Sequence, residues 1–213
     1  MVEFLASGPP SPSARFLCAH GAGAGMTTPF LAAMAQALTE RGIATLRFEF
    51  AYMASRRAGG AKKPPPRAER LMDEYAAAVE AAPAGVPLLI GGKSMGGRVA
   101  SLVADRLFGD GRIAGLVCLG YPFHPPNRPA QLRTAHLQDL TCPTLIVQGE
   151  RDPFGNRGEV EGYPLSGAIR FSWAADGDHD LGPRGASGHT RRGNLAAAAD
   201  AIANFAKAIG HRG

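Results

Sequence analysis

The sequence predicts an α/β fold: a mostly parallel, doubly wound sheet with helices on both faces. Short apolar runs alternate with longer amphipathic runs along the chain, an order typical of parallel strands joined by crossover helices. Several short runs are continuously apolar, as expected for strands that helices cover on both sides. The chain has no internal repeat and no interdomain linker, so we expect a single domain over residues 1–213.

This pattern predicts seven strands, one of them at an edge of the sheet, and four helices. Six apolar runs are predicted to be strands: Arg15–Ala19, Ile43–Phe50, Pro87–Ile90, Ile113–Leu119, Thr144–Gln148 and Ala168–Trp173. Four amphipathic runs are predicted to be helices: Thr28–Arg41, Arg67–Ala82, Met95–Phe108 and Arg191–Ile209. The opening residues Val2–Ala6 add an edge strand. Gly42 and Gly109 follow the first and third helices, where a C-terminal cap is expected.

The composition predicts a globular protein. Its 213 residues are 45% hydrophobic, enough to bury a full core. The first ten residues, MVEFLASGPP, lack the basic and apolar regions of a signal peptide. The longest apolar run, Ile113–Leu119, is too short to cross a bilayer. We therefore expect no membrane association and a cytoplasmic location.

Three cysteines, Cys18, Cys118 and Cys142, are scattered along the chain. Their odd number argues against a disulfide framework, and the absence of a CxxC spacing argues against a zinc site. We expect them to be small core residues in a reducing compartment, with no metal bound.

The net charge of +5 is concentrated between Arg56 and Arg70, around Pro64–Pro66. A basic segment of this kind could attract an anionic substrate or nucleic acid. It contains no aromatic residue to stack on bases, and a run of charge is usually solvated. We interpret it as an exposed loop and expect no nucleic-acid partner.

The most informative motif is Gly92-Lys93-Ser94-Met95-Gly96, a G-x-S-x-G sequence. In a nucleophile elbow, the serine occupies a sharp, strained turn between a strand and a helix, so the residues two positions away must lack bulk. An apolar run precedes the motif, and apolar residues follow it at helical spacing. This context predicts that Ser94 is a nucleophile raised above the carboxyl edge of the sheet.

Two nucleotide-binding motifs compete with this interpretation and fail on one residue each. Residues 92–94 resemble the end of a P-loop, but its first glycine would be Pro87. Residues 21–23 begin a G-x-G-x-x-G motif, with Glu49 as a ribose-binding acid, but the third glycine would be Met26. We expect no nucleotide and no other cofactor.

A nucleophilic serine needs a base, and the base needs an acid to orient it. Asp152 follows the predicted strand Thr144–Gln148, and His179 follows Ala168–Trp173. The order Ser, Asp, His, with each residue after a strand, is that of the nucleophile-elbow enzymes. Ser94, Asp152 and His179 are therefore the predicted catalytic triad. Substitutes for the acid are Glu150 and, less favoured, Asp176 and Asp178.

The loop His20–Gly25, HGAGAG, comes between a predicted strand and a predicted helix. Glycines let backbone N–H groups approach a bound oxygen closely, and a helix N-terminus favours negative charge. We predict an oxyanion hole formed by the backbone N–H groups of Ala22 and of Met95, the residue after the nucleophile.

The segments HGAGAG, GKSMG, GERDPFG and GDHDLG together resemble the α/β-hydrolase superfamily over most of the chain. More narrowly, the chain is similar to small dienelactone-hydrolase-like enzymes. GGKSMGGR is also similar to the hydrolase-like domain of an NSL chromatin complex subunit and of testis-expressed relatives. Dienelactone hydrolase itself has a cysteine nucleophile, whereas this chain has Ser94, so the resemblance does not imply lactone chemistry.

These features predict a serine hydrolase of the α/β-hydrolase fold that cleaves a small carboxylic ester or related acyl compound through an acyl-enzyme. The segment from Gly120 to Ala135 is too short for a sizeable lid, which predicts an open site. Two alternatives remain open. One is a non-catalytic interaction module on a hydrolase scaffold, and the other is a thioesterase or acyltransferase that uses the same serine.

Overall fold

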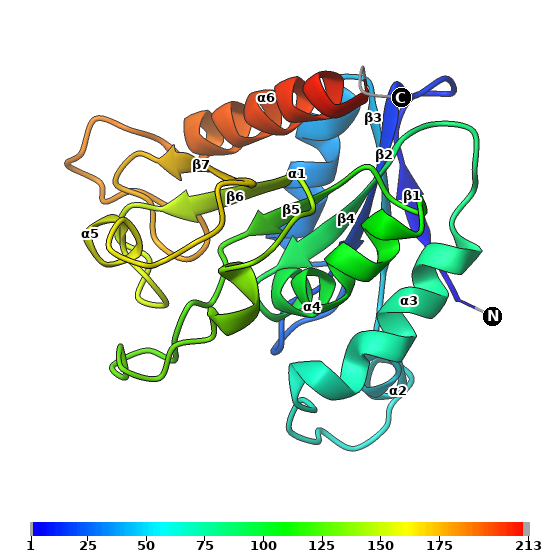
Figure 1. Ribbon diagram of the computed structural model, residues 1–213, viewed down its shortest axis with the longest axis horizontal. Coiled ribbons are helices and arrows are strands. Elements are labelled where there is room, and N and C mark those ends of the chain that lie inside the picture. The colour runs from blue at the N-terminus through cyan, green and yellow to red at the C-terminus, as the bar shows by residue number, and fades with distance from the viewer. Residues whose placement is uncertain (1, 211–213) are drawn as a thin grey trace.

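Seven strands form one sheet in the computed structural model, which describes residues 2–210 (Figure 1). The strands are β1 (Leu5–Ser7), β2 (Ala14–Ala19), β3 (Ile43–Phe48), β4 (Leu88–Lys93), β5 (Gly115–Leu119), β6 (Thr144–Gly149) and β7 (Ile169–Ala174). Their order in the sheet is β1-β3-β2-β4-β5-β6-β7. Only the pairing of β1 with β3 is antiparallel. The doubly wound, mostly parallel sheet expected from the sequence is thus confirmed.

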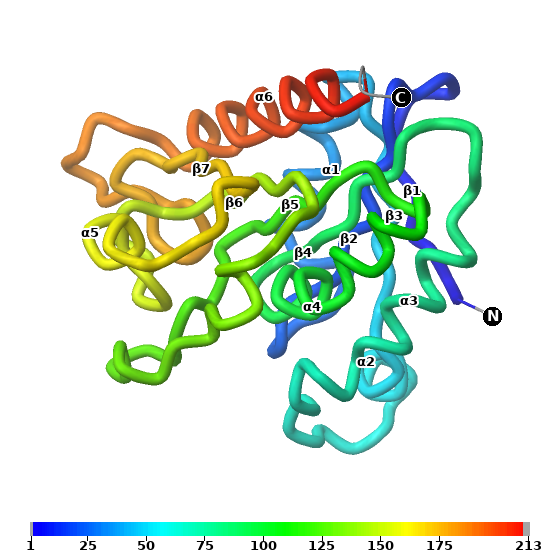
Figure 2. Tube along the Cα trace, viewed as in Figure 1, coloured from blue at the N-terminus to red at the C-terminus, as the bar shows by residue number. Residues whose placement is uncertain are grey.

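Helices cover both faces of this sheet (Figures 1 and 2). They are α1 (Pro29–Thr39), α2 (Ala51–Arg57), α3 (Met72–Ala81), α4 (Met95–Gly109), α5 (Arg157–Val160) and α6 (Arg191–Gly210). Helices α1 and α6 pack on one face, and α3 and α4 pack on the other. The two buried clusters on either side of the sheet explain why β4, β5 and β6 are apolar without alternation.

The predicted strands are all present, with shifts at their ends. The first element, β1, covers Leu5–Ser7 in place of Val2–Ala6. Strand β4 continues to Lys93, three residues past the predicted end, because Gly91 and Gly92 pair with β5. The sequence prediction stopped before them because glycine is uncommon in strands. Strand β3 stops at Phe48, and Phe50 instead begins α2 as its N-cap.

The predicted helices are also present, and their caps differ in detail. Thr28 is the N-cap of α1, with Pro29 at the first helical position. Gly42 has the left-handed φ of +78° expected after α1. The prediction that Gly109 caps α4 is wrong: Gly109 is the last helical residue, and Gly111 has the left-handed φ of +68°.

The basic segment is only partly the exposed loop that we expected. Arg56 and Arg57 lie on α2, and Ala68–Leu71 form a 3₁₀ turn before α3. Arg57 forms ion pairs with the carboxylates of Glu3 and Glu49. Residues 58–65 between these elements are exposed and have no regular structure. The sequence did not reveal α2 because its seven residues carry no apolar stripe of helical period.

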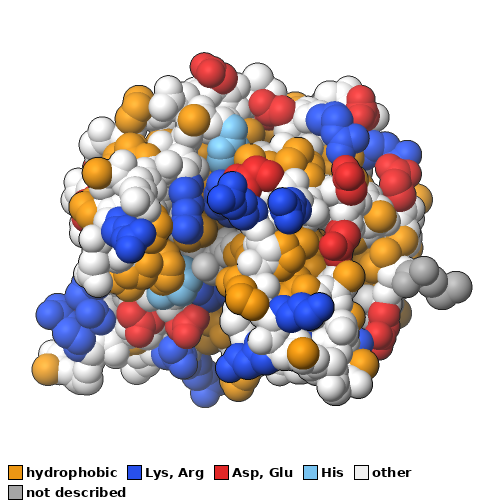
Figure 3. Space-filling view, turned by 90° about the horizontal axis from the view of Figure 1, so that it is seen from below, with side chains coloured by type: hydrophobic (Ala, Val, Ile, Leu, Met, Phe, Trp, Pro, Cys, Tyr) orange, Lys and Arg blue, Asp and Glu red, His pale blue; other side chains and the backbone are white. Residues whose placement is uncertain are grey.

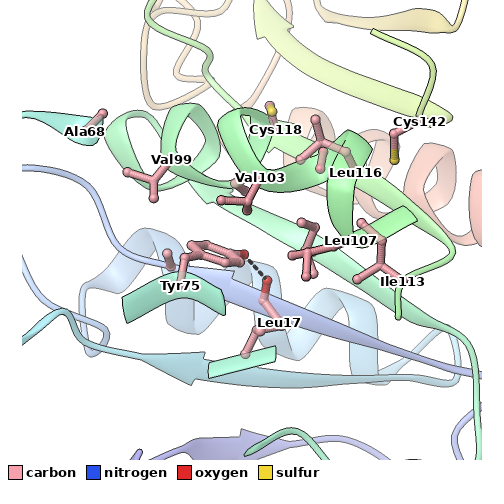
Figure 4. Packing of buried hydrophobic residues seen from close by; sticks show 14 of the residues in the cluster. Leu17, Ala68, Tyr75, Val99, Val103, Leu107, Ile113, Leu116, Cys118 and Cys142 are labelled. Carbon is pink, nitrogen blue, oxygen red and sulfur yellow. Dashed lines mark hydrogen bonds between the residues drawn. The ribbon is translucent and has the colours of Figure 1, made fainter. Parts of the chain in front are cut away.

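Tyr75 of α3 joins the helix layer to the backbone of two strands (Figure 4). Its hydroxyl lies 3.0 Å from the carbonyl oxygen of Leu17 in β2 and accepts the N–H of Gly91 in β4 at 2.7 Å. The side chain is fully buried and packs in the same cluster as Val99 and Val103 of α4. This contact helps to fix the strand that leads into Ser94.

Strands β2 to β7 all run in the same direction, so the loops that follow them gather at one edge of the sheet. Backbone hydrogen bonds continue past the strand ends and connect these loops. They run from Ser94 N to Leu119 O (2.9 Å), from Gly120 N to Val147 O (2.8 Å), and from Glu150 N to Ala174 O (3.2 Å). The loops after β4, β5, β6 and β7 are therefore held in register with one another.

All three cysteines are buried, as expected for core residues. Burial raises the pKa of the Cys18 and Cys142 thiols to about 12 and that of Cys118 further still, so none is a ready nucleophile. Within residues 2–210, no helix has both the length and the apolar character that crossing a membrane requires.

Replacing Tyr75 with Phe should lower the free energy of unfolding by about 1–3 kcal/mol, because the buried Gly91 N–H loses its acceptor. Urea denaturation measures this change. Tyr163→Phe is the control, since the half-buried Tyr163 hydroxyl has no hydrogen-bond partner among residues 2–210. Equal stability of the two variants would show that the Tyr75 hydroxyl contributes nothing.

Candidate active site

Ser94 occupies the turn between β4 and α4 with a φ of +52° and a ψ of −114°. Residues other than glycine rarely adopt a positive φ, and such strain persists only where the surroundings enforce it. Here the Ser94 N–H donates to the carbonyl of Leu119, and the next residue already belongs to α4. The strained turn expected of a nucleophile elbow is present.

The two glycines of the motif are required by one neighbouring carbonyl group. A Cβ on Gly92 would lie 2.4 Å from the carbonyl oxygen of Ala19, and a Cβ on Gly96 would lie 2.6 Å from the same atom. Both distances are far below van der Waals contact. The elbow therefore fits only because β2 ends against two residues that have no side chain.

Asp152 and His179 meet at the same edge. His179 Nδ1–H donates to Asp152 Oδ2 at 2.8 Å, and Asp152 is completely buried. The other carboxylate oxygen accepts the backbone N–H of Phe154 at 2.9 Å. The Phe154 ring also packs against the imidazole, with centroids 4.3 Å apart. His179 is thus held between a carboxylate and an aromatic ring, and its Nε2 is left without a proton when the imidazole is neutral.

Gln148 holds Asp152 in place, a role that sequence analysis missed. Its fully buried amide nitrogen lies within hydrogen-bond distance of Asp152 Oδ2 (3.0 Å) and of the carbonyls of Tyr121 and Gly155 (both 3.1 Å). Its amide oxygen accepts the Tyr121 N–H at 2.7 Å. A glutamine inside an apolar strand was the available signal, because a buried amide must be fully hydrogen-bonded.

Lys93 connects the elbow to the histidine loop. Its ammonium group lies 3.3 Å from Asp180, the residue after His179, and its side chain is only 9% exposed. Burial lowers the pKa of Lys93, while the carboxylates of Asp180 and Asp152 act in the opposite direction. The second residue of the motif is therefore a buried lysine beside the triad candidates, which sequence analysis did not foresee.

His20 shapes the glycine loop. Its Nδ1 donates to the Gly21 carbonyl at 2.6 Å, and its Nε2 accepts the Phe50 N–H at 3.2 Å, which fixes one neutral tautomer. Burial lowers the pKa of His20, which favours the neutral imidazole. The hydroxyl of Tyr52 donates to the Ala22 carbonyl at 3.1 Å. These contacts hold the loop beside Ser94.

The two predicted oxyanion donors both border a hollow at Ser94. Ala22 is in the glycine loop, and Met95 is the first residue of α4. Both line the same hollow as Ser94. Neither backbone N–H has a hydrogen-bond partner among the described residues. Both N–H groups are therefore available to bind an oxygen atom. Their role as oxyanion donors stays a prediction.

The rival acids have structural partners. Glu150 accepts the Asp176 N–H and pairs with Arg157. Asp176 pairs with Arg151 and Arg184, and hydrogen bonds from Arg184 lower its pKa to about 2. The third rival, Asp178, accepts two backbone N–H groups within its own loop. Among residues 2–210, none of these three carboxylates forms a hydrogen bond or ion pair with the His179 side chain.

A second Ser–His contact lies beneath α4. Ser101 Oγ is 2.8 Å from His136 Nε2, but Ser101 is 3% exposed and no substrate can reach it. Burial, reinforced by the positive charge of Arg98, lowers the pKa of His136 to about 4. This pair is part of the core.

Two hollows flank Ser94. The first, of about 500 Å³, is lined by His179, Lys93, Phe30 and the glycine loop. The second, of about 580 Å³, is lined by Met95, Arg98, Arg133 and residues 65–69. Ser94, Ala22 and Phe154 border both. Ser94 makes no hydrogen bond to His179 among residues 2–210, although both face the first hollow. In this range, no cluster of three or more His, Cys, Asp or Glu residues could hold a metal ion.

The fold and this geometry agree with the comparison to protein families. The sequence model of the alpha/beta hydrolase domain family matches residues 12–207. The chain belongs to that family. The match includes the glycine loop, the elbow and the loops that carry Asp152 and His179.

Solved structures share the α/β-hydrolase fold with this chain. An alpha-beta serine hydrolase homologue from Coxiella burnetii is 21% identical, with a TM-score of 0.65 over 95% of this chain and 90% of that one. Dienelactone hydrolase from Anabaena variabilis is 19% identical, with a TM-score of 0.69 over 96% and 90%. Est1E from Butyrivibrio proteoclasticus, solved with ferulic acid, is 18% identical, with a TM-score of 0.67 over 98% and 95%. At these identities the likeness concerns the fold.

In this α/β-hydrolase, Ser94→Gly should be more stable than Ser94→Ala by about 1 kcal/mol, because glycine adopts the positive φ of the elbow without steric strain. Thermal and urea unfolding of the two variants, both of which lack the hydroxyl, provide the measurement. A more stable alanine variant would mean that the elbow stores no strain.

Gly96→Ala should destabilise the fold by at least about 2 kcal/mol, because the new methyl group would overlap the carbonyls of Ala19 and His20. The control is Gly109→Ala in the same helix, where a Cβ meets no atom within 4 Å. That variant should gain about 0.4–1 kcal/mol from the reduced entropy of its unfolded chain. Denaturant midpoints compare the two, and similar values would contradict the steric explanation.

Proposed function

We propose that the chain is a serine hydrolase that cleaves a carboxylic ester of a small molecule through an acyl-enzyme on Ser94. The observation that carries this proposal is the 2.8 Å contact between His179 Nδ1 and Asp152 Oδ2, beside a serine with a φ of +52°. Membership of the alpha/beta hydrolase domain family supports it. So do the glycine loop and the two hollows that meet at Ser94.

In the proposed mechanism, Asp152 accepts a hydrogen bond from the Nδ1–H of His179, which keeps the proton on Nδ1 and leaves Nε2 able to take a proton. His179 removes the proton of Ser94 Oγ as this oxygen attacks the carbonyl carbon of the ester. Asp152 then stabilises the imidazolium that forms. Gln148 acts as a positioning residue, because its amide and the Phe154 N–H fix the carboxylate.

The carbonyl oxygen becomes negatively charged in the tetrahedral intermediate. The N–H groups of Ala22 and Met95 would stabilise this oxyanion. The bond from the acyl carbon to the leaving oxygen breaks as His179 gives its proton to the departing alcohol. Water then attacks the acyl-enzyme with His179 again as base, which releases the acid and restores Ser94.

A fluorophosphonate probe should label wild-type protein stoichiometrically at Ser94, because the reagent phosphonylates an activated serine whatever the substrate. Intact-mass measurement and peptide mapping locate the label. Ser94→Ala and His179→Ala should both lose it while remaining folded. Ser101→Ala is the matched control, because it removes the other Ser–His contact, and it should keep the label.

The outcomes separate the remaining functions. No labelling of folded wild-type protein would contradict the proposal and favour a non-catalytic interaction module. With labelling established, matched ester, thioester and amide substrates, and an alcohol as competing acceptor, distinguish an esterase from a thioesterase or acyltransferase. The proposal expects the ester to have the highest kcat/KM, with water as the acceptor.

A further inference from the structure

Three arginines surround the hollow on the side of Ser94 away from His179. Arg98 comes from α4, Arg67 from the chain before α3, and Arg133 from the connection between β5 and β6. Glu69 is the one carboxylate on this wall within the described chain. Figure 3 shows Lys and Arg side chains gathered near the middle of the face on which α2 and the chain before α3 lie. The hollow has a surplus of positive charge.

The arginine groups are not satisfied by the protein itself. Arg98 Nη2 donates to Glu69 at 2.5 Å, but its Nε is buried and has no hydrogen-bond partner among residues 2–210. The guanidinium of half-buried Arg133 has neither a hydrogen bond nor an ion pair in this range. Burial and the neighbouring Arg98 both lower the pKa of Arg133. An anion in the hollow would pair with the guanidinium of Arg133 and with the exposed part of the Arg98 guanidinium, which is 19% exposed as a side chain.

The position of Arg98 relative to Ser94 follows from helix geometry. Ser94 is the N-cap of α4, and the Arg98 N–H donates to the Ser94 carbonyl at 3.1 Å, so Arg98 lies one turn into the helix. Four residues of helix rise by about 6 Å. Side chains on a helix lean toward its N-terminus, which directs the guanidinium back toward the elbow. In a substrate whose anionic group is bound by Arg98, only a few covalent bonds would separate that group from the carbonyl carbon that Ser94 attacks.

The side of the cleft indicates which part of a substrate carries the charge. A leaving alcohol must take its proton from His179, which lines the first hollow. The arginine hollow does not include His179. The leaving group therefore faces the first hollow, and the acyl chain faces the arginines.

We propose that Arg98 and Arg133 bind a carboxylate at the far end of the acyl chain, so that the substrate is a half-ester of a short dicarboxylic acid. This inference rests on the proposed function. A guanidinium presents paired N–H donors that match a carboxylate, and both side chains are within the hollow that contains Ser94. Hydrolysis would break the bond between the acyl carbon and the alcohol oxygen, consume one water, and release a dicarboxylate, an alcohol and a proton.

The test compares two ethyl esters of nearly equal shape. Monoethyl glutarate has a terminal carboxylate, and ethyl 4-carbamoylbutanoate has a neutral amide in its place. Wild-type protein should hydrolyse the anionic ester with a kcat/KM higher by about 10- to 100-fold, the range of charge-assisted hydrogen bonds. Arg133→Gln and Arg98→Gln should each lose most of this preference, mainly through the rate on the anionic ester.

Two further variants sharpen the result. Glu69→Gln removes the carboxylate that competes for Arg98, so the preference for the anionic ester should rise. Arg112→Gln is the matched control, because Arg112 pairs with Glu80 and lines neither hollow beside Ser94. It should keep the wild-type preference. Equal rates on both esters, or a preference unchanged in both Arg98→Gln and Arg133→Gln, would overturn the proposal.

Binding of glutarate itself separates this inference from the hydrolase proposal. Calorimetric titration of Ser94→Ala with glutarate should show binding that glutaramide lacks and that an added Arg133→Gln change abolishes. This result would support the anion site even if Ser94 failed to react with the fluorophosphonate. A Ser94-labelled protein that binds no glutarate and prefers the neutral ester would remain a hydrolase but would lack the proposed site. Preference for 4-acetoxybutanoate over its amide, with the charge on the alcohol part, would also overturn it.

Discussion

The close approach of the elbow to the carbonyl oxygen of Ala19 is the constraint on which the candidate site depends. Two positions, Gly92 and Gly96, must lack a Cβ because this one oxygen lies within 2.6 Å of where each Cβ would be. The same packing leaves Ser94 with a φ of +52°, since the chain has to turn directly from β4 into α4. Tyr75 adds a fixed contact to the strand just before the turn. Strain at one residue is thus balanced by tight packing around it.

The acid and base depend on a second arrangement, the register of the loops after β4 to β7. Backbone hydrogen bonds between successive strand ends bring Asp152 and His179 to one edge although 27 residues separate them. Buried polar groups then set their orientation. Gln148 bonds to Asp152 and to both neighbouring loops, and Lys93 pairs with Asp180 beside the histidine. The site is a connected polar network on a rigid sheet.

The cleft is asymmetric in charge as well as in shape. His179 faces one hollow together with Lys93, Asp180 and Arg191. Arg67, Arg98 and Arg133 face the other, against the single carboxylate of Glu69 among the described residues, and Ser94 borders both. The acyl part and the alcohol part of an ester bound at Ser94 would therefore meet different side chains. The 3₁₀ turn Ala68–Leu71 and the chain before it form one wall of the arginine hollow. Part of the basic segment between Arg56 and Arg70 therefore borders the cleft.

The sequence by itself determined the sheet class and nearly every strand and long helix, because apolar periodicity is a local signal. The G-x-S-x-G spacing and the order of the strands also pointed to Ser94, Asp152 and His179 as candidates, and the structure places Asp152 in contact with His179. Three features required the tertiary structure: the short helix α2, the role of Gln148, and the arginine hollow. The arginines come from three separate segments, and nothing local relates Arg98 to Arg133. Burial and mutual contact are properties of the folded chain, and only folding decided which polar side chains surround Ser94.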